Sequence, residues 1–441
     1  MSVLTHRVAA AVGLKTRMPS WDGATPQRLR LTRMALLLAT ILVGLVGVVL
    51  ADGALQSVEQ LDTRTSRALI ATRQAHAALT DADRVVVHSF LSGDVLLGGP
   101  GQRYQDAIKT ANQSIEQLAE AVGSESADSR KLQSIDAELV TYIGLVEQAD
   151  AAHRAEKATA GSAAAETAGL GEAYLWYGSR MLHEPGSGLL ARIDQLSAEQ
   201  QQTLNAGRWW LGAGALWTYL VVAVLLLGGL AVAQIWMVRR FRRWVSLPLA
   251  LATACALAVC AWTAVDLVHV QRTYASAEQD GLRPLLERWR VRSAAADTEG
   301  QSALGTLLVA RCPAKAACQS TITDLGASIS VAARQAREAS AKLTFSPDSL
   351  FSRSLAASER VGTDVIRRDL VAARRDVQAA EPAFSRFDTE QLSRIQAEQK
   401  VLSRKMQSAQ EAPGLRIGIP ILAVAIVILT FLGFGPRLNE Y

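Results

Sequence analysis

The sequence predicts an all-α membrane protein with four transmembrane helices and two extracytoplasmic antiparallel helical bundles in a duplicated arrangement. Three observations lead to this fold class. They are four long apolar windows, a biased placement of arginine and lysine around those windows, and helical patterning throughout the two long segments between them. The chain has 441 residues and is 49% hydrophobic, and the windows concentrate that apolar content instead of spreading it evenly.

Each apolar window holds roughly 18 or more residues with no charged side chain in its interior, enough for a helix to cross a hydrocarbon core about 30 Å thick. A core helix of a globular protein rarely runs so long without a charge. A cleaved signal peptide is the rival interpretation of the first window, but its basic region and apolar run both exceed the usual lengths. The predicted spans are residues 34–51, 209–238, 244–265 and 417–434.

Basic residues predict the orientation of these spans. The tail 1–33 carries six lysines and arginines against one acid, Asp22, and the loop 239–243 carries four arginines and no acid. Because such residues stay cytoplasmic, the tail, the loop and the C-terminal residues 435–441 are expected inside, in a multi-pass protein of the plasma membrane. The long segments 52–208 and 266–416 are then expected outside.

The two outer segments are rich in helix-forming residues and poor in aromatic residues. Apolar residues at spacings of three and four, as in Leu132, Ile135 and Leu139, predict amphipathic helices. Glycine, proline and small-residue stretches divide each segment into several helices, and four amphipathic helices with short loops pack economically as a bundle. The expected breaks include 98–101, 123–129, 159–171, 185–188, 312–318, 346–348 and 381–382, and Pro284 is expected to kink or restart a helix.

Several function classes find no support. The formal net charge of +5 reflects mainly the topology signal, so nucleic-acid binding is not favoured. The six histidines are scattered singly, with none at metal spacing from another histidine or a cysteine, and no catalytic motif appears, so we expect no enzyme, no bound metal and no cofactor. Acidic residues fall among lysines and arginines, which indicates solvated helix faces. Charged or broken mid-membrane helices, the usual sign of a transporter, are also missing from the sequence.

The four cysteines fall into two groups. Cys255 and Cys260 lie inside the third predicted span, where thiols behave as small apolar groups. Cys312 and Cys318 lie six residues apart in a polar segment that is predicted to be outside, where disulfides form. A zinc site would need further ligands that the neighbourhood lacks. The sequence therefore predicts a disulfide between Cys312 and Cys318.

Two surfaces are candidates for protein partners. The densest aromatic cluster outside the spans could be a partner patch, because tyrosine, tryptophan and arginine dominate binding hot spots, or it could be bundle core. The basic inner segments could dock an acidic cytoplasmic protein or only contact lipid phosphates. The outer candidates are Tyr174, Trp176, Tyr177 and Arg180, and the inner ones are Arg239, Arg240, Arg242, Arg243, Trp21, Arg28 and Arg30.

Two strings stand out beside the order of spans and helical segments, which covers the whole chain. One is Arg-Arg-Phe-Arg-Arg-Trp at 239–244 leading into 247–260, and the other is Glu-Ala-Tyr-Leu at 172–175 running to Met181. In this order and in these strings the chain resembles the GlnX membrane proteins of actinobacteria. The resemblance implies a signalling relay. In that family a solute-binding lipoprotein related to glutamine-binding proteins senses amino acids such as aspartate or glutamate, and protein kinase G, a serine/threonine kinase, receives the signal and controls nitrogen and central metabolism.

Two other functions stay open. The protein could be a receptor of the chemoreceptor type that binds a small ligand between its own outer helices, or a structural membrane scaffold. A receptor should bind a metabolite directly, a relay should bind a loaded binding protein, and a scaffold should do neither. The small inner mass and the outer mass of roughly 300 residues favour the relay, because helices continuous with spans suit small displacements.

Overall fold

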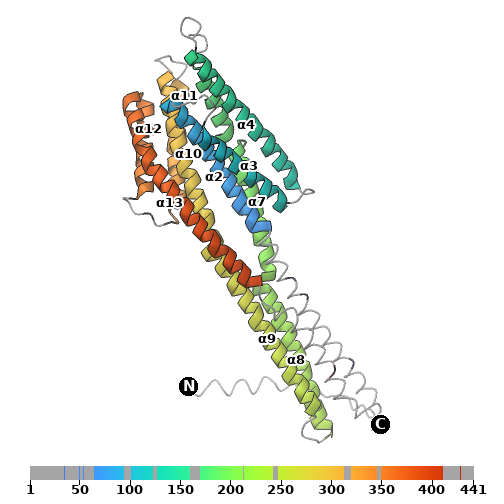
Figure 1. The fold of residues 1–441 in the computed structure, drawn as a ribbon. Helices are drawn as coiled ribbons and strands as arrows, with labels where there is room; N and C mark the ends of the chain where they lie inside the picture. Colours follow the sequence, from blue (N-terminus) through green and yellow to red (C-terminus); the bar gives the residue numbers. More distant parts are fainter. Residues whose placement is uncertain are drawn as a thin grey trace. The chain divides into compact units, whose positions relative to one another are not determined.

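The structure is a computed structural model, and every element that it describes is a helix or a connection between helices (Figure 1). The all-α prediction is confirmed for the part of the chain that the structure describes. The described residues are 64–93, 101–122, 127–158, 169–211, 213–241, 247–311, 319–343 and 349–410, with isolated residues at 34, 49, 53, 345 and 428.

The helices follow the predicted breaks closely along the chain. Proline, glycine and small-residue stretches separate most of them, as these residues favour turns over helix interiors. In order they are α2 Ser66–Ser92, α3 Gln102–Val122, α4 Ala127–Ala158, α6 Leu170–His183, α7 Leu189–Leu211, α8 Ala213–Phe241, α9 Leu247–Ala277, the π-helix η2 Glu278–Leu282, α10 Arg283–Arg311, α11 Gln319–Ser340, α12 Leu350–Arg367 and α13 Leu370–Gln410.

The chain divides into two units. One unit comprises Met1–Asp52, Leu216–Leu267 and Pro413–Tyr441. The other, which we call the helical unit, comprises Gly53–Ala215 and Val268–Ala412. The helical unit thus contains both of the long segments for which the sequence predicts separate bundles.

A shared apolar core explains why the two long segments form one unit. Helix α2, from the first segment, packs extensively against α10, from the second, as well as against α3 (Figure 1). The core is lined by residues of both segments, among them Leu79 and Val86 of α2, Leu304 of α10 and Ile329 of α11. Two separate bundles would leave this α2 face exposed, so its burial stabilises the joined arrangement.

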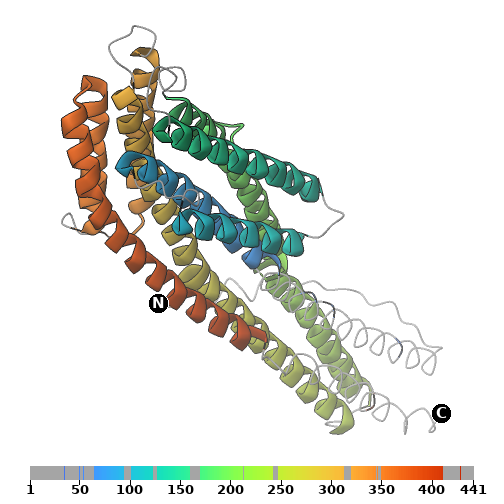
Figure 2. The same ribbon diagram turned by 45° about the horizontal axis from the view of Figure 1, so that its top comes forward.

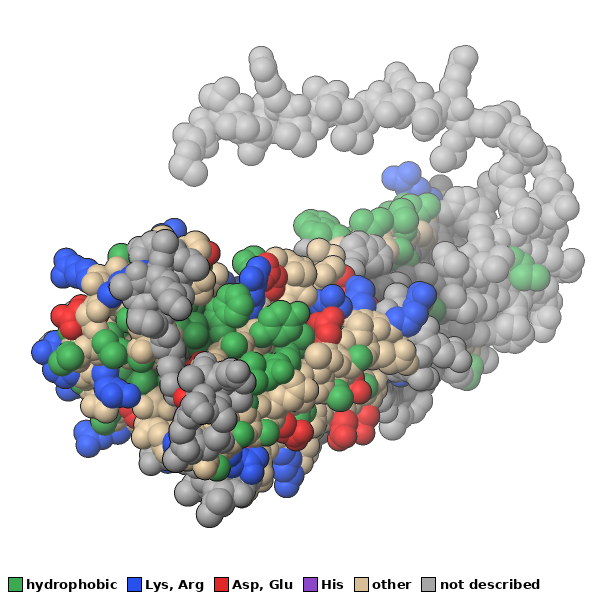
Figure 3. Space-filling view, turned by 90° about the horizontal axis from the view of Figure 1, so that it is seen from above, with side chains coloured by type: hydrophobic (Ala, Val, Ile, Leu, Met, Phe, Trp, Pro, Cys, Tyr) green, Lys and Arg blue, Asp and Glu red, His purple; other side chains and the backbone are tan. Residues whose placement is uncertain are grey.

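A second core cluster lies within the second segment, between α10, α11, α12 and α13. Phe351, Phe384 and Phe387 form its centre, with the rings of Phe351 and Phe387 5.4 Å apart between centroids. Aromatic pairs at such distances add packing energy beyond the area that they bury. The surface of the helical unit carries basic and acidic side chains dispersed among other residues (Figure 3), as expected of a face in water.

The break predicted at Glu381–Pro382 is wrong. Helix α13 runs through Pro382 without interruption (Figure 2). The break before α13 lies instead at residues 368–370. There Arg368 takes a left-handed conformation with φ of 60°, and the Asp369 carboxylate accepts a hydrogen bond from the Ala372 N–H at 3.0 Å. A proline inside a helix costs about 3 kcal/mol, and the burial of neighbouring Phe384 offsets this cost.

One helix among the described residues is long and apolar enough to cross a membrane. It is Thr253–Ala310, whose apolar portion overlaps the third predicted span. Within α8 the apolar stretch Trp217–Gly229 is shorter. The first and fourth predicted spans lie almost entirely outside the described residues, so four spans and the positions of the termini stay predictions.

Candidate functional site

A network of buried charged side chains lies inside the helical unit, where α2, α10 and α13 meet. Its first members, Asp83 and Arg84, are in the middle of α2, and their exposed fractions are 2% and 6%. Both faces of α2 are covered, by α3 and α7 on the first segment and by α10 on the second. Buried charges are tolerated only when they are paired and hydrogen-bonded, so these residues depend on partners from other helices.

Arg84 connects three helices. Its guanidinium donates to Asp81 Oδ1 from Nε at 3.1 Å and from Nη2 at 3.0 Å, and to Glu381 Oε2 on α13 from Nη1 at 3.1 Å. The same Nη1 lies 3.6 Å from Glu299 Oε2 on α10. Burial alone would lower the pKa of Arg84, but the charges of these three carboxylates outweigh it and raise the pKa, so the arginine stays charged.

Glu299 and His88 complete this end of the network. The Glu299 carboxyl is 1% exposed, and burial, together with the nearby Glu381 charge, raises its pKa well above the usual range. His88 Nδ1 lies 3.6 Å from Glu381 Oε2, and burial and the Arg84 charge lower the pKa of His88 to about 4. His88, Glu299 and Glu381 lie close enough together to hold a metal ion, but the Arg84 guanidinium already places a positive charge against both carboxylates.

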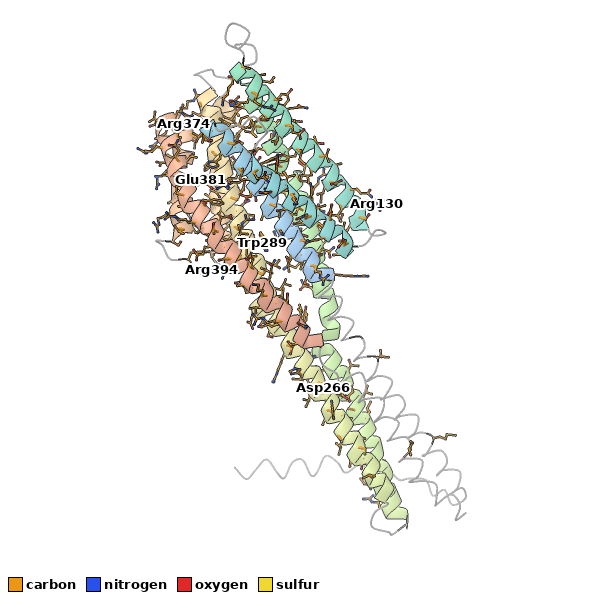
Figure 4. The ribbon with its side chains drawn as sticks, in the orientation of Figure 1. Arg130, Asp266, Trp289, Arg374, Glu381 and Arg394 are labelled. Carbon is orange, nitrogen blue, oxygen red and sulfur yellow. The ribbon has the colours of Figure 1, made fainter. Side chains whose placement is uncertain are left out.

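Arg292 on α10 extends the network toward a cavity. Its Nε donates to Asp388 Oδ1 at 2.5 Å, and its Nη2 lies 3.6 Å from Asp81 Oδ2. The cavity, of about 410 Å³, is bounded by residues of α2, α3, α10 and α13. Figure 4 labels Trp289 on α10 and Glu381 on α13 in this region. Charged and aromatic residues that line the cavity are Asp81, Arg84, Arg103, Asp106, Trp289, Arg292, Phe384 and Asp388.

Such a lining suits a small charged or zwitterionic molecule. Guanidinium groups recognise carboxylates and phosphates through paired hydrogen bonds, and carboxylates recognise ammonium groups. The volume lies within the usual range of ligand pockets. The lining residues come from both long segments, so an occupant would contact α2 and α3 on one side and α10 and α13 on the other.

A second buried cluster joins α6 to the same α2 and α10 pair. Asp83 accepts hydrogen bonds from the Ser179 hydroxyl at 2.8 Å and the Tyr142 hydroxyl at 3.1 Å, and burial raises its pKa. His183 Nε2 forms an ion pair with Asp297 Oδ1 of α10 at 2.9 Å. Burial would lower the pKa of His183, but Asp297 outweighs it and raises the pKa to about 9. His183 is therefore charged at neutral pH.

The residues of the predicted outer patch lie on α6. Tyr177 is 57% exposed and Arg180 is also exposed, with its guanidinium 5.5 Å from the Trp176 ring centroid. Trp176 and Tyr174 are partly buried and pack against the core. The structure therefore gives the four residues mixed roles. Tyr177 and Arg180 offer contact surface, while the other two contribute to packing.

The other predicted site residues lie mostly outside the described part of the chain. Arg239 is exposed near the end of α8, and Arg240 lies on the same helix. Trp21, Arg28, Arg30, Arg242 and Arg243 lie outside the described residues, as do Cys312 and Cys318. The proposed docking segments and the disulfide therefore stay predictions.

Sequence patterns did not reveal the buried network. The sequence pattern predicts that the acidic residues lie on solvated helix faces. This prediction is wrong for Asp83 and Glu299, which are almost fully buried. The sequence does contain one indication that Asp83 and Arg84 are buried, since alanine, leucine and valine surround these charged residues in α2. The Arg84 partners Glu299 and Glu381 are about 200 to 300 positions away in the sequence, so no local pattern connects them.

Comparison with known protein families identifies part of the chain. Residues 57–208 match the actinobacterial sensor domain. The match covers about a third of the chain and includes α2, α3, α4, α6 and α7. It supports an actinobacterial sensor protein with a role in signal transduction. No curated protein and no solved structure matches the chain.

The matched segment 57–208 supplies one half of each buried cluster. Arg84 and His88 of this segment meet Glu299 and Glu381 of the second long segment, and His183 meets Asp297. Two clusters of buried charges thus lie between segment 57–208 and helices α10 and α13, beside the apolar core. A change in segment 57–208 that moved these charges would alter the free energy of the contacts with α10.

Proposed function

We propose that the protein is a signal relay of the plasma membrane that couples an extracytoplasmic amino-acid-binding lipoprotein to a cytoplasmic serine/threonine protein kinase. The observation that carries the proposal is the continuous helical path from α9 through η2 into α10. This path starts in the apolar helix and reaches Asp297 and Glu299, which pair with the sensor domain. The domain match supports signal sensing, and the identity of both partners is the proposed part.

Exposed apolar residues on α8 and α9 support membrane association. Trp217, Leu225 and Val232 on α8 are 63%, 70% and 67% exposed, and Val265 on α9 is 67% exposed. Soluble proteins rarely expose so many large apolar side chains on neighbouring turns of one helix. A hydrocarbon environment removes the cost of that exposure. The multi-pass arrangement with both termini in the cytoplasm belongs to the proposal.

Helix α6 connects a surface to the interior. Tyr177 and Arg180 face outward, while Ser179 and His183 of the same helix contact Asp83 and Asp297 inside. A partner that bound the outward face and moved α6 would therefore act directly on α2 and α10. Helix shifts of about 1–2 Å are typical of such transitions. The π-helix η2 provides a place where α10 can adjust relative to α9, since π-segments are frequent at functional sites.

The proposed inner contact is the arginine loop 239–243 together with the basic tail around Trp21. An acidic kinase surface would gain association rate from these positive charges, and salt would reduce that gain. The proposal places the catalytic part of the response in a separate protein. The kinase is the proposed receiver of the signal.

Site-specific crosslinking tests both partners. A photo-reactive residue at Tyr177 should capture the lipoprotein, and one at Arg239 should capture the kinase, in membranes of the native host. The matched control is Val371, which is 83% exposed on α13 and has no role in the proposal. Equal capture from Val371 and Tyr177, or no kinase at Arg239 and at a second probe near Trp21, would overturn the relay.

Direct binding of a small ligand is the second candidate, favoured by the charged cavity of about 410 Å³. In that case the full chain in detergent should bind an amino acid without any lipoprotein. Replacing Arg103 by Gln should weaken this binding, because Arg103 lines the cavity outside the Arg84 network. A relay should show no such binding and should respond only to the loaded lipoprotein.

A further inference from the structure

We propose that the sensor domain holds a divalent transition-metal ion, of which zinc is the best fit, between α4 and α6. The ligands are His153 and Glu156 of α4 and Glu172 of α6, and each offers a ligand atom within 4.8 Å of the other two. This proposal is independent of the relay and of the identity of any partner.

The placement of the three residues follows from two helices. His153 and Glu156 are three positions apart on α4 and therefore lie on one face of that helix. Glu172 lies in the first turn of α6, which packs extensively on α4. His153 and Glu172 are 6% and 2% exposed, so most of the site is withdrawn from solvent.

The distance between His153 and Glu172 is close to the ligand spacing that a bound ion requires. Two ligands of a tetrahedral zinc ion, each about 2.0–2.1 Å from the metal, lie about 3.4 Å apart. His153 Nδ1 and Glu172 Oε1 are 3.9 Å apart. A closure of about half an ångström brings them to ligand spacing, which is within the reach of a small rotation of the Glu172 side chain. A water molecule would complete the coordination, as in zinc sites with three protein ligands.

Charge favours a cation at this place. Glu156 and Glu172 bring two negative charges to one imidazole, and Asp150 lies one turn earlier on α4. The two basic residues next to His153 and Glu156 in the sequence contact other groups. Arg154 pairs with Asp150 at 2.7 Å, and the Lys157 ammonium donates to the Gly93 carbonyl at 3.1 Å. An imidazole and carboxylates without a thiolate select zinc or a similar first-row ion.

The surrounding packing orients the ligands. The Phe90 ring lies 5.0 Å from the His153 ring, centroid to centroid, and restricts the imidazole. Gly171 permits the close approach of α6, because a Cβ at this position would lie 2.9 Å from the Ala149 carbonyl oxygen and 3.2 Å from His153 N. Gly171 is therefore a positioning residue for the site, and its replacement by Ala should move Glu172 away from His153.

Metal analysis of the full chain tests the proposal. Protein purified in detergent without a histidine tag is stripped with a chelator, given Zn²⁺, dialysed and measured by mass spectrometry of the metal. We expect about one zinc per chain, lost in Glu172→Gln and His153→Ala and reduced in Gly171→Ala. Glu172→Gln keeps the size of the side chain, so it separates loss of a ligand from loss of the fold.

The chain offers a matched control. His88, Glu299 and Glu381 have the same residue types at similar spacing, but Arg84 lies against both of those carboxylates. Glu299→Gln should therefore retain zinc, and so should Cys312→Ser with Cys318→Ser. Absence of bound zinc in the parent protein, retention in Glu172→Gln, or loss in Glu299→Gln would each overturn the assignment. As a second readout, Zn²⁺ should raise the melting temperature of the parent protein and leave that of Glu172→Gln unchanged.

Discussion

Protonation of His183 should make the stability of the helical unit depend on pH. Burial opposes the charge, but the ion pair with Asp297 outweighs it and raises the pKa from its ordinary 6.5 to about 9. One pKa unit corresponds to about 1.4 kcal/mol, so the bound proton stabilises the fold by on the order of 3 kcal/mol. Because the pKa of His183 is higher in the folded state, protonation favours folding. This stability is fully present below pH 6.5 and is lost as the pH rises through about 9.

The assay is thermal unfolding of the full chain and of His183→Gln at several pH values. For a unit of roughly 300 residues, about 3 kcal/mol corresponds to about 5 °C in melting temperature. Because burial also raises the pKa values of Asp83 and Glu299, the quantity to compare is the difference between the parent protein and the variant. This difference should be largest near pH 6 and should shrink above pH 9. A difference that stays constant from pH 6 to 10 would refute the assignment of the charge to His183.

Three further outcomes are expected. A cysteine near Arg240 should be shielded from a membrane-impermeant thiol reagent in intact cells, and one near Ser126 should react; labelling at Arg240 would reverse the proposed topology. Cys312 and Cys318 should be oxidised to each other and contribute about 2–3 kcal/mol, whereas four free thiols in denatured, unreduced protein would exclude the bond. Arg84→Met should destabilise the fold by about 3–5 kcal/mol, because it leaves the Asp81 and Glu381 carboxylates without their counter-charge. Adding Glu381→Gln should recover part of that loss in chemical unfolding.

Helix positions could be predicted from the sequence where a break has a local cause. The Pro185–Gly188 string lies between α6 and α7, as expected, because proline and glycine favour turns there. The same rule failed at Pro382, where packing of Phe384 and Phe387 in the second core cluster outweighs the cost of proline. It also missed the start of α13, although Asp369 is a favourable residue type for a helix N-terminus.

The joining of the two long segments could not be predicted from local patterns. Both α2 and α10 have apolar residues that suit a separate bundle, and only tertiary contact decides that each faces the other. The buried clusters could not be predicted for the same reason, because they too depend on tertiary contact. His183 and Asp297 are more than a hundred positions apart, and the histidine looks isolated until α6 and α10 are packed. The apolar windows and the arginine bias, by contrast, are local and visible in the sequence.

Kinase recruitment in a reconstituted membrane directly tests the proposed relay. The full chain is placed in vesicles with the lipoprotein on one side and the kinase on the other, and kinase binding is measured with and without the amino-acid ligand. We expect that the loaded lipoprotein changes kinase binding. Asp297→Asn, which weakens the pairing of α10 with His183, should reduce this change while lipoprotein binding persists. Kinase binding that is the same with loaded, empty or absent lipoprotein would contradict the relay.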